Sequence, residues 1–212
     1  MSFDRIAPYY RLLETLAFGY SLQSARVCWI KKISLPKRVL IVGEGDGRFL
    51  SELLRIFPQI YIDCIDSSAK MLELARVRVL ATDPESSIHV RFLHRDILTW
   101  SPQHSYDLLI THFVLDCFSR RELNRIVQKL SDAATSDAVW LIADFTLPQN
   151  GFARIRAKLW LRVMHTFFHI TAGITAKELV DATPYLRANG FTCTSRRLML
   201  SRMLMSEWYS RG

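Results

Sequence analysis

Apolar and polar residues alternate with two different periods in the first half of the chain. Residues 38–42 form a β-branched apolar run that ends at Gly43, a pattern typical of a strand buried in a parallel sheet. Residues 60–65 repeat this pattern and end at Asp66. Between the two runs, apolar residues recur at helical spacing over 49–57. The pattern predicts a strand–helix–strand unit with parallel strands.

The same alternation continues to residue 143. The further predicted elements are a helix capped by Ser67 or Ser68, strands at 88–93, 106–111 and 138–143, and a helix at 119–130. Together with the first two strands, this gives five strands separated by helical stretches. Such an order predicts an α/β fold in which helices cover both faces of a parallel sheet.

The two ends of the chain follow other patterns. We expect the N-terminal 30 residues to be helical and amphipathic, with a break around Gly19. After residue 150 the predicted elements are helices at about 151–170 and 176–188, then strands near 191–197 and 199–206. The last two strands are expected to form an antiparallel finish, which completes a doubly wound, mostly parallel sheet of seven strands. No Pro-, Gly- or Ser-rich linker is visible, so 1–212 is expected to form a single domain.

The composition narrows the class of protein. Of 212 residues, 50% are hydrophobic and 23% are charged, which excludes a disordered chain. The four cysteines include no C-x-x-C pair, which argues against a zinc site or a disulfide framework and suits a reducing compartment. No secretory signal and no uninterrupted apolar run of about 18 residues is visible. We therefore expect a cytoplasmic protein.

Positive charge is concentrated in the last third of the chain. Residues 151–212 hold ten Lys and Arg against three Asp and Glu, a balance of +7, whereas residues 1–150 hold 18 against 17. One stripe of the predicted helix at 151–170 consists of Arg154, Lys158, Arg162, His165 and His169. Such a basic amphipathic helix is typical of contact with a membrane surface or an anionic ligand, and a solvated charged face is the alternative. The two histidines could bind zinc from one helix face, but no third ligand is visible, so no metal is expected.

Three glycines follow the first predicted strand. Gly43, Gly45 and Gly47 lie at a strand-to-helix turn, where missing side chains let the backbone pass close to a ligand. A dinucleotide fingerprint would need a small residue where Arg48 stands. The G-x-G-x-G spacing instead suits a nucleoside ligand without a pyrophosphate. Asp66 ends the next strand, 23 residues after Gly43, where its carboxylate can accept hydrogen bonds from both ribose hydroxyls.

With these glycines, the run 66–76 (Asp-Ser-Ser-Ala-Lys-Met-Leu-Glu-Leu-Ala-Arg) resembles the class I S-adenosylmethionine-dependent methyltransferases. The segment 94–97 (His-Arg-Asp-Ile) resembles the family segment whose acid meets the adenine amino group, and 106–110 is similar to the family's fourth strand. The runs 3–10 and 143–148 look like those of quinone-type C-methyltransferases and small lipid N-methyltransferases. The resemblance is strong over residues 38–118 and looser beyond them.

The resemblance implies a Rossmann-like methyltransferase fold that uses S-adenosylmethionine as its cofactor. It divides the chain into a helical lid at 1–35, a cofactor-binding core at 36–150, and acceptor-side helices with a terminal strand pair at 151–212. The cofactor-binding residues that it implies are Gly43, Glu44, Gly45, Asp66, Ser67, Asp96, Ile97 and Thr111.

The catalytic candidates are His112 and Tyr10. His112 follows the fourth strand and could deprotonate the methyl acceptor, since an ordinary histidine takes up protons near neutral pH. Tyr10 matches a tyrosine of the family's lid. The family's usual acid two residues before the first glycine is replaced by Ile41, and Glu44 and Asp46 could supply the missing negative charge.

The sequence thus predicts methyl transfer from S-adenosylmethionine to a small-molecule or lipid-like acceptor, apolar or anionic. Its pocket is expected to be mostly apolar, capped by Tyr9, Tyr10, Trp160, Met164 and Phe167. Peripheral membrane contact through 151–170 is a related expectation; no oligomeric state is predicted. Two alternatives stay open: a nucleic-acid methyltransferase or binding module using the basic last third, and a non-catalytic cofactor-binding protein. Nucleic acid is less favoured because the bases alternate with large apolar side chains.

Overall fold

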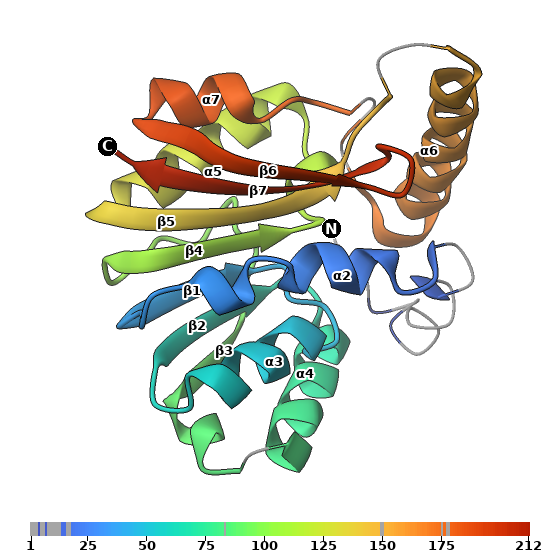
Figure 1. Ribbon diagram of the computed structural model, residues 1–212. Helices are drawn as coiled ribbons and strands as arrows, with labels where there is room; N and C mark the ends of the chain where they lie inside the picture. Colours follow the sequence, from blue (N-terminus) through green and yellow to red (C-terminus); the bar gives the residue numbers. More distant parts are fainter. Residues whose placement is uncertain are drawn as a thin grey trace.

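The computed structural model describes residues 4, 7, 14, 15, 18–82, 84–148, 151–174, 176 and 179–212. Their core is one seven-stranded sheet in the order β3-β2-β1-β4-β5-β7-β6 (Figure 1). The strands are β1 (Arg38–Val42), β2 (Tyr61–Asp66), β3 (Val90–His94), β4 (Tyr106–His112), β5 (Ala134–Phe145), β6 (Phe191–Met199) and β7 (Leu204–Arg211). This confirms the predicted seven-stranded α/β fold.

The strand directions place a topological switch point at the centre of the sheet. The first five strands are parallel, and β7 pairs antiparallel with both β5 and β6. From β1 the chain builds outward through β2 to β3, and then returns to add β4 and β5 on the other side. In such sheets, ligands bind outside the carboxyl ends of the strands at the point where the order reverses. That point lies between β1 and β4.

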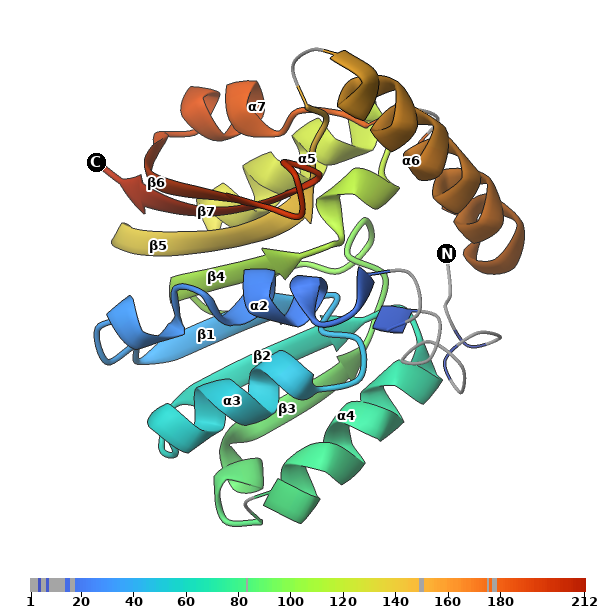
Figure 2. The ribbon, with the colours of Figure 1, turned by 45° about the vertical axis from the view of Figure 1, so that its right-hand side comes forward.

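Helices cover both faces of the sheet. One face packs against α2 (Ser21–Val27), α3 (Arg48–Ile56) and α4 (Ala69–Thr82), and the other against α5 (Arg120–Asp132) and α7 (Thr183–Ala188) (Figures 1 and 2). Alternate residues of β1 point to opposite faces of the sheet. Val39 and Ile41 face α3 and α4, and Leu40 and Val42 face α5 and α7. Three short 3₁₀ helices complete the body: η1 (Ile30–Lys32), η2 (Ser86–His89) and η3 (Leu115–Cys117). The four apolar side chains of β1 are all buried, which explains its unbroken apolar run.

The helix α6 (Gly151–Ala172) differs from the others in position. It stands at one end of the molecule, beyond the carboxyl edge of β5, rather than lying flat on the sheet (Figures 1 and 2). Its inner side chain Leu161 belongs to a small apolar cluster with Phe18, Phe145 and Leu204. This places α6 beside the edge where a ligand would bind.

Several predicted boundaries were wrong. The helix predicted at 176–188 covers only 183–188, because Pro184 starts a helix and the Asp181 carboxylate accepts a hydrogen bond from the Thr183 N–H just before it. Strand β6 ends at 199 and strand β7 begins at 204, because residues 200–202 adopt positive φ angles and form the turn between them. The strand predicted at 138–143 extends over 134–145, and 3₁₀ helix η2 precedes β3, which begins at Val90.

Candidate cofactor site

A pocket lies at the switch point, between the glycine loop after β1 and the segment after β4. Every one of its walls is a strand end, a loop or the start of a helix. It is lined by Val42, Gly43, Gly45, Ile65, Asp66, Ser67, Met71, Arg95, Asp96, Ile97, Phe113, Val114, Cys117 and Phe118. Six of the eight residues predicted to bind the cofactor therefore line one pocket, and the remaining two, Glu44 and Thr111, do not.

Each of the three glycines in the loop has a backbone conformation that other residues rarely adopt. Gly43, Gly45 and Gly47 have φ angles of 71°, 72° and 81°, which L side chains rarely adopt. A Cβ on Gly47 would lie 2.6 Å from the Cα of Ala75, so this glycine lets α3 pack against α4. A Cβ on Gly45 would meet nothing within 4 Å. The backbone at Gly45 is thus open to the pocket.

Asp66 is positioned by backbone groups on both sides of the pocket. Its carboxylate accepts hydrogen bonds from the Ser68 N–H at 2.8 Å and from the Gly45 N–H at 3.4 Å. Burial raises the pKa of Asp66 to about 6, and these two donors oppose the shift. The group is therefore an ionised hydrogen-bond acceptor at neutral pH, able to bind paired hydroxyl groups.

The opposite end of the pocket is built by a turn after β3. The Asp96 carboxylate accepts the Leu98 N–H at 2.9 Å, which fixes the turn that presents Ile97 to the pocket. Lys129 on α5 supports the same turn: its Nζ donates to the carbonyl oxygens of Ile97, Leu98 and Trp100 at 2.6–3.0 Å. This arrangement can receive a flat ring with an amino group, since it offers one carboxylate beside an apolar side chain.

The middle of the pocket is narrow. A Cβ on Gly43 would lie 2.7 Å from Cγ2 of Val114, because the segment after β4 packs directly on the glycine loop. Phe113, next to Val114, has a φ angle of 55°, a strained value for a bulky residue. Only a glycine therefore allows the loop and the segment after β4 to approach this closely.

The pocket lies in an acidic environment. The thiol of Cys117 lines it, and burial raises the pKa of this thiol, with further increases from Asp116, Asp144 and Asp66. Burial and the neighbouring Asp116 carboxyl also raise the pKa of Asp144 well above its ordinary value. The two carboxyls therefore share protons rather than carrying two full charges. Arg95 also lines the pocket, so the groups around it carry charges of both signs.

Glu44 and Thr111, predicted to bind the cofactor, lie outside the lining of this pocket. The Glu44 carboxylate turns away from the pocket and accepts the Leu50 N–H at 2.9 Å, so it caps the start of α3. Burial raises the pKa of Glu44 to about 8, so this group is largely neutral and does not supply the charge missing at Ile41. The Thr111 hydroxyl accepts the indole N–H of Trp140 at 2.9 Å, on the sheet face that packs against α5.

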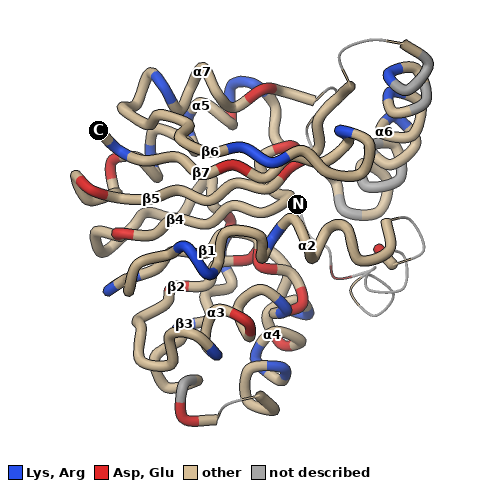
Figure 3. The backbone as a smooth tube through the Cα atoms, in the orientation of Figure 1, with Lys and Arg blue, Asp and Glu red and all other residues tan. Residues whose placement is uncertain are grey.

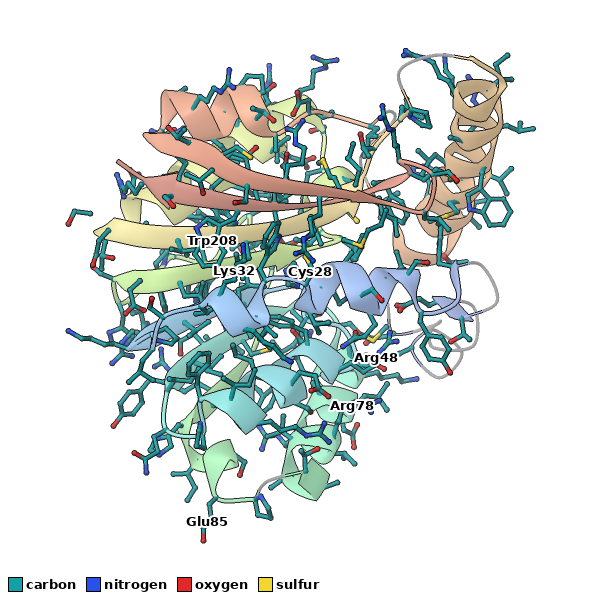
Figure 4. All side chains as sticks on the ribbon, viewed as in Figure 1. Cys28, Lys32, Arg48, Arg78, Glu85 and Trp208 are labelled. Atoms are coloured by element: carbon teal, nitrogen blue, oxygen red, sulfur yellow. The ribbon has the colours of Figure 1, made fainter. Side chains whose placement is uncertain are left out.

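Asp46 also serves the fold rather than the pocket. Its carboxylate binds Arg48 Nε at 2.8 Å and Arg78 Nη2 at 3.1 Å, and its carbonyl oxygen accepts Arg78 Nε at 2.7 Å. Figure 4 shows the two arginines close together beside the end of α2. Arg48 also contacts Glu14 at 2.8 Å, and Glu14 makes a two-point pair with Arg26. We call these five residues the buried ionic network; it ties the N-terminal segment to the glycine loop.

The structure does not favour His112 as a catalytic base. His112 is 6% exposed, lies edge-on to the Phe49 ring at 4.7 Å, and shares that sheet face with α3. Burial and the charge of Arg26 lower the pKa of His112 to about 3. Within the part of the chain that the structure describes, neither ring nitrogen has a hydrogen-bond partner. A histidine that binds protons this weakly is a poor general base at neutral pH.

The other predicted residues have mixed outcomes. Tyr9 and Tyr10 lie outside the described residues, as do the side chains of His165 and Phe167. His169 Nδ1 lies 2.8 Å from the Ile174 carbonyl oxygen, where it stabilises the end of α6. The N-terminal segment does reach the pocket region, because the Asp4 carboxylate accepts hydrogen bonds from Ser68 Oγ and Lys70 N.

Sequence reasoning missed the residues that close the pocket after β4: Phe113, Val114, Cys117 and Phe118. Their position directly after a strand at the switch point was the available signal. In the described part of the chain, no cluster of three or more His, Cys, Asp or Glu side chains could hold a metal ion. None of the helices described combines the length and apolarity needed to cross a membrane.

Comparison with known proteins agrees with this geometry. Residues 39–137 match the family described as "Methyltransferase domain". Over 164 residues the chain is 26% identical to polyamine aminopropyltransferase 2 of Bacillus anthracis, a match that spans 73% of this chain and 43% of that relative. The chain thus spans less than half the length of this curated relative.

Solved structures show the same fold at low sequence identity. Mitomycin 7-O-methyltransferase superposes with a TM-score of 0.71 and 17% identity, covering 100% of this chain and 61% of that one. Magnesium protoporphyrin IX methyltransferase of Synechocystis, solved with bound S-adenosylhomocysteine, gives a TM-score of 0.66 and 17% identity, covering 90% and 81%. Just under half of the chain, residues 39–137, thus matches the methyltransferase-domain family, and the chain as a whole has the fold of these solved methyltransferases.

Proposed function

We propose that the protein transfers a methyl group from S-adenosylmethionine to a small-molecule acceptor. The observation that carries the proposal is the convergence of Gly45, Asp66 and the Asp96–Ile97 pair on one pocket at the switch point. Asp66 would hold the ribose hydroxyls, and Asp96 with Ile97 would hold the adenine ring. S-adenosylmethionine, when bound, supplies a methyl group activated by a positively charged sulfur.

The surrounding charges support this cofactor class. Asp66, Asp116 and Asp144 lie near enough to Cys117 to raise the pKa of its thiol. The ionised Asp66 carboxylate inside the pocket disfavours the pyrophosphate of a dinucleotide. The chain's own contribution to transfer is to align the acceptor and exclude water, because the two carboxylates that line the pocket, Asp66 and Asp96, are assigned here to the cofactor.

We further propose that the acceptor is amphiphilic, with an apolar portion. A row of aromatic rings leads from the pocket wall to α6: Phe113 to Phe145 at 5.3 Å, Phe145 to Phe18 at 5.4 Å, and Phe18 to Trp160 at 6.3 Å. An apolar acceptor chain could lie along this row and keep its reactive atom at the pocket. The nucleic-acid alternative has less support, since the exposed cations of α6 alternate with aliphatic side chains.

Calorimetry with S-adenosylhomocysteine tests the cofactor site. Asp66→Ala leaves ribose hydroxyls without a partner and should weaken binding by about 1–3 kcal/mol. Asp132→Ala removes an exposed carboxylate on α5 and should leave the affinity unchanged. Equal affinities of the wild type and Asp66→Ala would remove Asp66 from the site.

Transfer of a labelled methyl group to amphiphilic acceptors tests the activity itself. Tight binding of S-adenosylhomocysteine without transfer to any acceptor would favour the non-catalytic alternative. An absence of binding by the wild type would contradict the cofactor assignment.

A further inference from the structure

The outward face of α6 exposes large aliphatic side chains. Ile155, Leu159, Val163 and Ile170 are 67%, 63%, 54% and 72% exposed. They follow helical steps of four, four and seven residues, so they share one side of the helix. The structure turns this side to solvent.

Cations accompany the aliphatic residues along the same face. Arg154, Lys158 and Arg162 each precede one of them and are exposed. No Asp or Glu occurs between residues 151 and 172, so all the charged side chains of the helix itself are positive. Figure 3 shows the blue segments of α6 without a red one. We call this set of seven residues the outer face of α6.

The outer face is separate from the packing of α6 against the body. Ala157 and Leu161 are buried on the inner side, where Leu161 meets Phe18 and Phe145. In both views α6 stands at the end of the molecule, and the turn between β6 and β7 lies next to it (Figures 1 and 2). That turn exposes Arg202, so the charge around α6 is positive here too.

We propose that the outer face of α6 docks on an anionic lipid surface. Aliphatic side chains that alternate with cations on one helix face are what an interfacial helix needs, because the former enter the acyl boundary while the latter meet the headgroups. A second copy of the chain fits less well. A symmetric contact would bring this face against itself and place Arg154, Lys158 and Arg162 opposite like charges.

The docking also extends the proposed function. The aromatic row that ends at Trp160 runs from α6 to the pocket wall, and Trp160 is 39% exposed. A lipid surface at α6 would therefore lie at the start of the route proposed for an amphiphilic acceptor. Docking itself requires neither cofactor nor transfer, so it can fail or succeed independently of the proposed activity.

Sedimentation of the full chain with vesicles tests this. Vesicles of phosphatidylcholine with a third of phosphatidylglycerol should bind the protein, and pure phosphatidylcholine vesicles should bind it at least tenfold more weakly. Changing Arg154, Lys158 and Arg162 together to Gln should reduce binding on the order of a hundredfold, since each cation near such a surface contributes about 1 kcal/mol. Changing Ile155, Leu159 and Val163 together to Ser should reduce it to a similar extent.

A matched variant controls for total charge. Arg121, Arg125 and Arg187 are exposed on α5 and α7, and changing all three to Gln removes the same charge away from α6. This variant should bind vesicles almost as the wild type does, and all variants should bind S-adenosylhomocysteine with wild-type affinity.

Three results would overturn the proposal. One is equal binding to neutral and anionic vesicles, and another is equal loss in the α6 and control charge variants. The third is a wild-type protein that does not bind vesicles and that light scattering shows to be a dimer, while the Ser variant is a monomer. The outer face of α6 would then join two copies of the chain.

Discussion

The glycine loop and α6 use the same residue types in opposite ways. Around the loop, Arg26, Arg48 and Arg78 are held by Glu14 and Asp46 in the buried ionic network. Along α6, the cations are exposed and the helix carries no acid. Charges that are buried must be paired, and their partners then determine where the backbone lies. The cations of α6, in contrast, lie on a helix outside the main core.

The comparison extends to the apolar side chains. Behind the loop, Phe49, Leu50 and Leu53 of α3 are almost fully buried, whereas α6 leaves more than half of Ile155, Leu159 and Val163 exposed. Substitutions at the loop should therefore change stability and cofactor affinity together. Substitutions on the outer face of α6 should change neither.

The largest difference in the free energy of unfolding is expected between alanine substitutions at two glycines. Gly47→Ala forces an L residue to a φ of 81° and places its Cβ 2.6 Å from Ala75, which should lower the free energy of unfolding by about 3 kcal/mol or more. Gly173→Ala, after α6, has a φ of 68° but no neighbour within 4 Å, so about 1 kcal/mol is expected. Urea denaturation measures both, and equal losses would show that close packing at Gly47 is unimportant.

Glu44 should make the loop region sensitive to pH. Its pKa in the folded protein is raised to about 8 by burial, so the stability it contributes is complete at low pH and is lost as pH rises through 8. Glu44→Gln keeps the acceptor for Leu50 N–H and cannot ionise. Between pH 6 and 9 the variant should gain on the order of 2 kcal/mol relative to wild type. Urea denaturation midpoints of the wild type and Glu44→Gln that change in parallel with pH would contradict this. Lys158→Gln is the matched control, and its midpoint should change with pH as that of the wild type does.

The buried ionic network should tolerate charge removal less well than α6. Asp46→Asn leaves Arg48 and Arg78 without their shared carboxylate and should cost about 1–2 kcal/mol of stability, since both arginines are partly screened by solvent. The affinity for S-adenosylhomocysteine should fall with it, because Arg78 also holds the Asp46 carbonyl within the glycine loop. A stable variant with normal affinity would mean that the glycines alone determine the loop.

The smallest effect is expected on α6. The Gln variant at Arg154, Lys158 and Arg162 should unfold within about 0.5 kcal/mol of wild type, since the side chains are exposed and the helix lies outside the main core. Thermal unfolding measured beside the Arg121, Arg125 and Arg187 variant checks this. A loss of 2 kcal/mol confined to the α6 variant would show that these cations support the fold.

The local pattern of the sequence determined most of the architecture. The β-branched run at 38–42, the glycines after it and Asp66 at the next strand end are all local signals, and each reports on backbone geometry within a few residues. The alternation of strands and helices then leaves few topologies, because parallel strands need right-handed crossovers. The switch point, and the pocket edge with it, follow from that order.

The tertiary structure alone decided how individual side chains are used. Glu44 and Asp66 both lie beside the pocket loops, yet only the packing of α3 turns Glu44 to the Leu50 N–H. His112 ends a strand like Asp66, but it is buried against Phe49, and burial together with the charge of Arg26 lowers its pKa. Such outcomes depend on contacts distant in sequence, where burial and neighbouring charge determine protonation. For the same reason the helical period of α6 could define its stripes but not which stripe would meet solvent, since that depends on where the body of the protein lies.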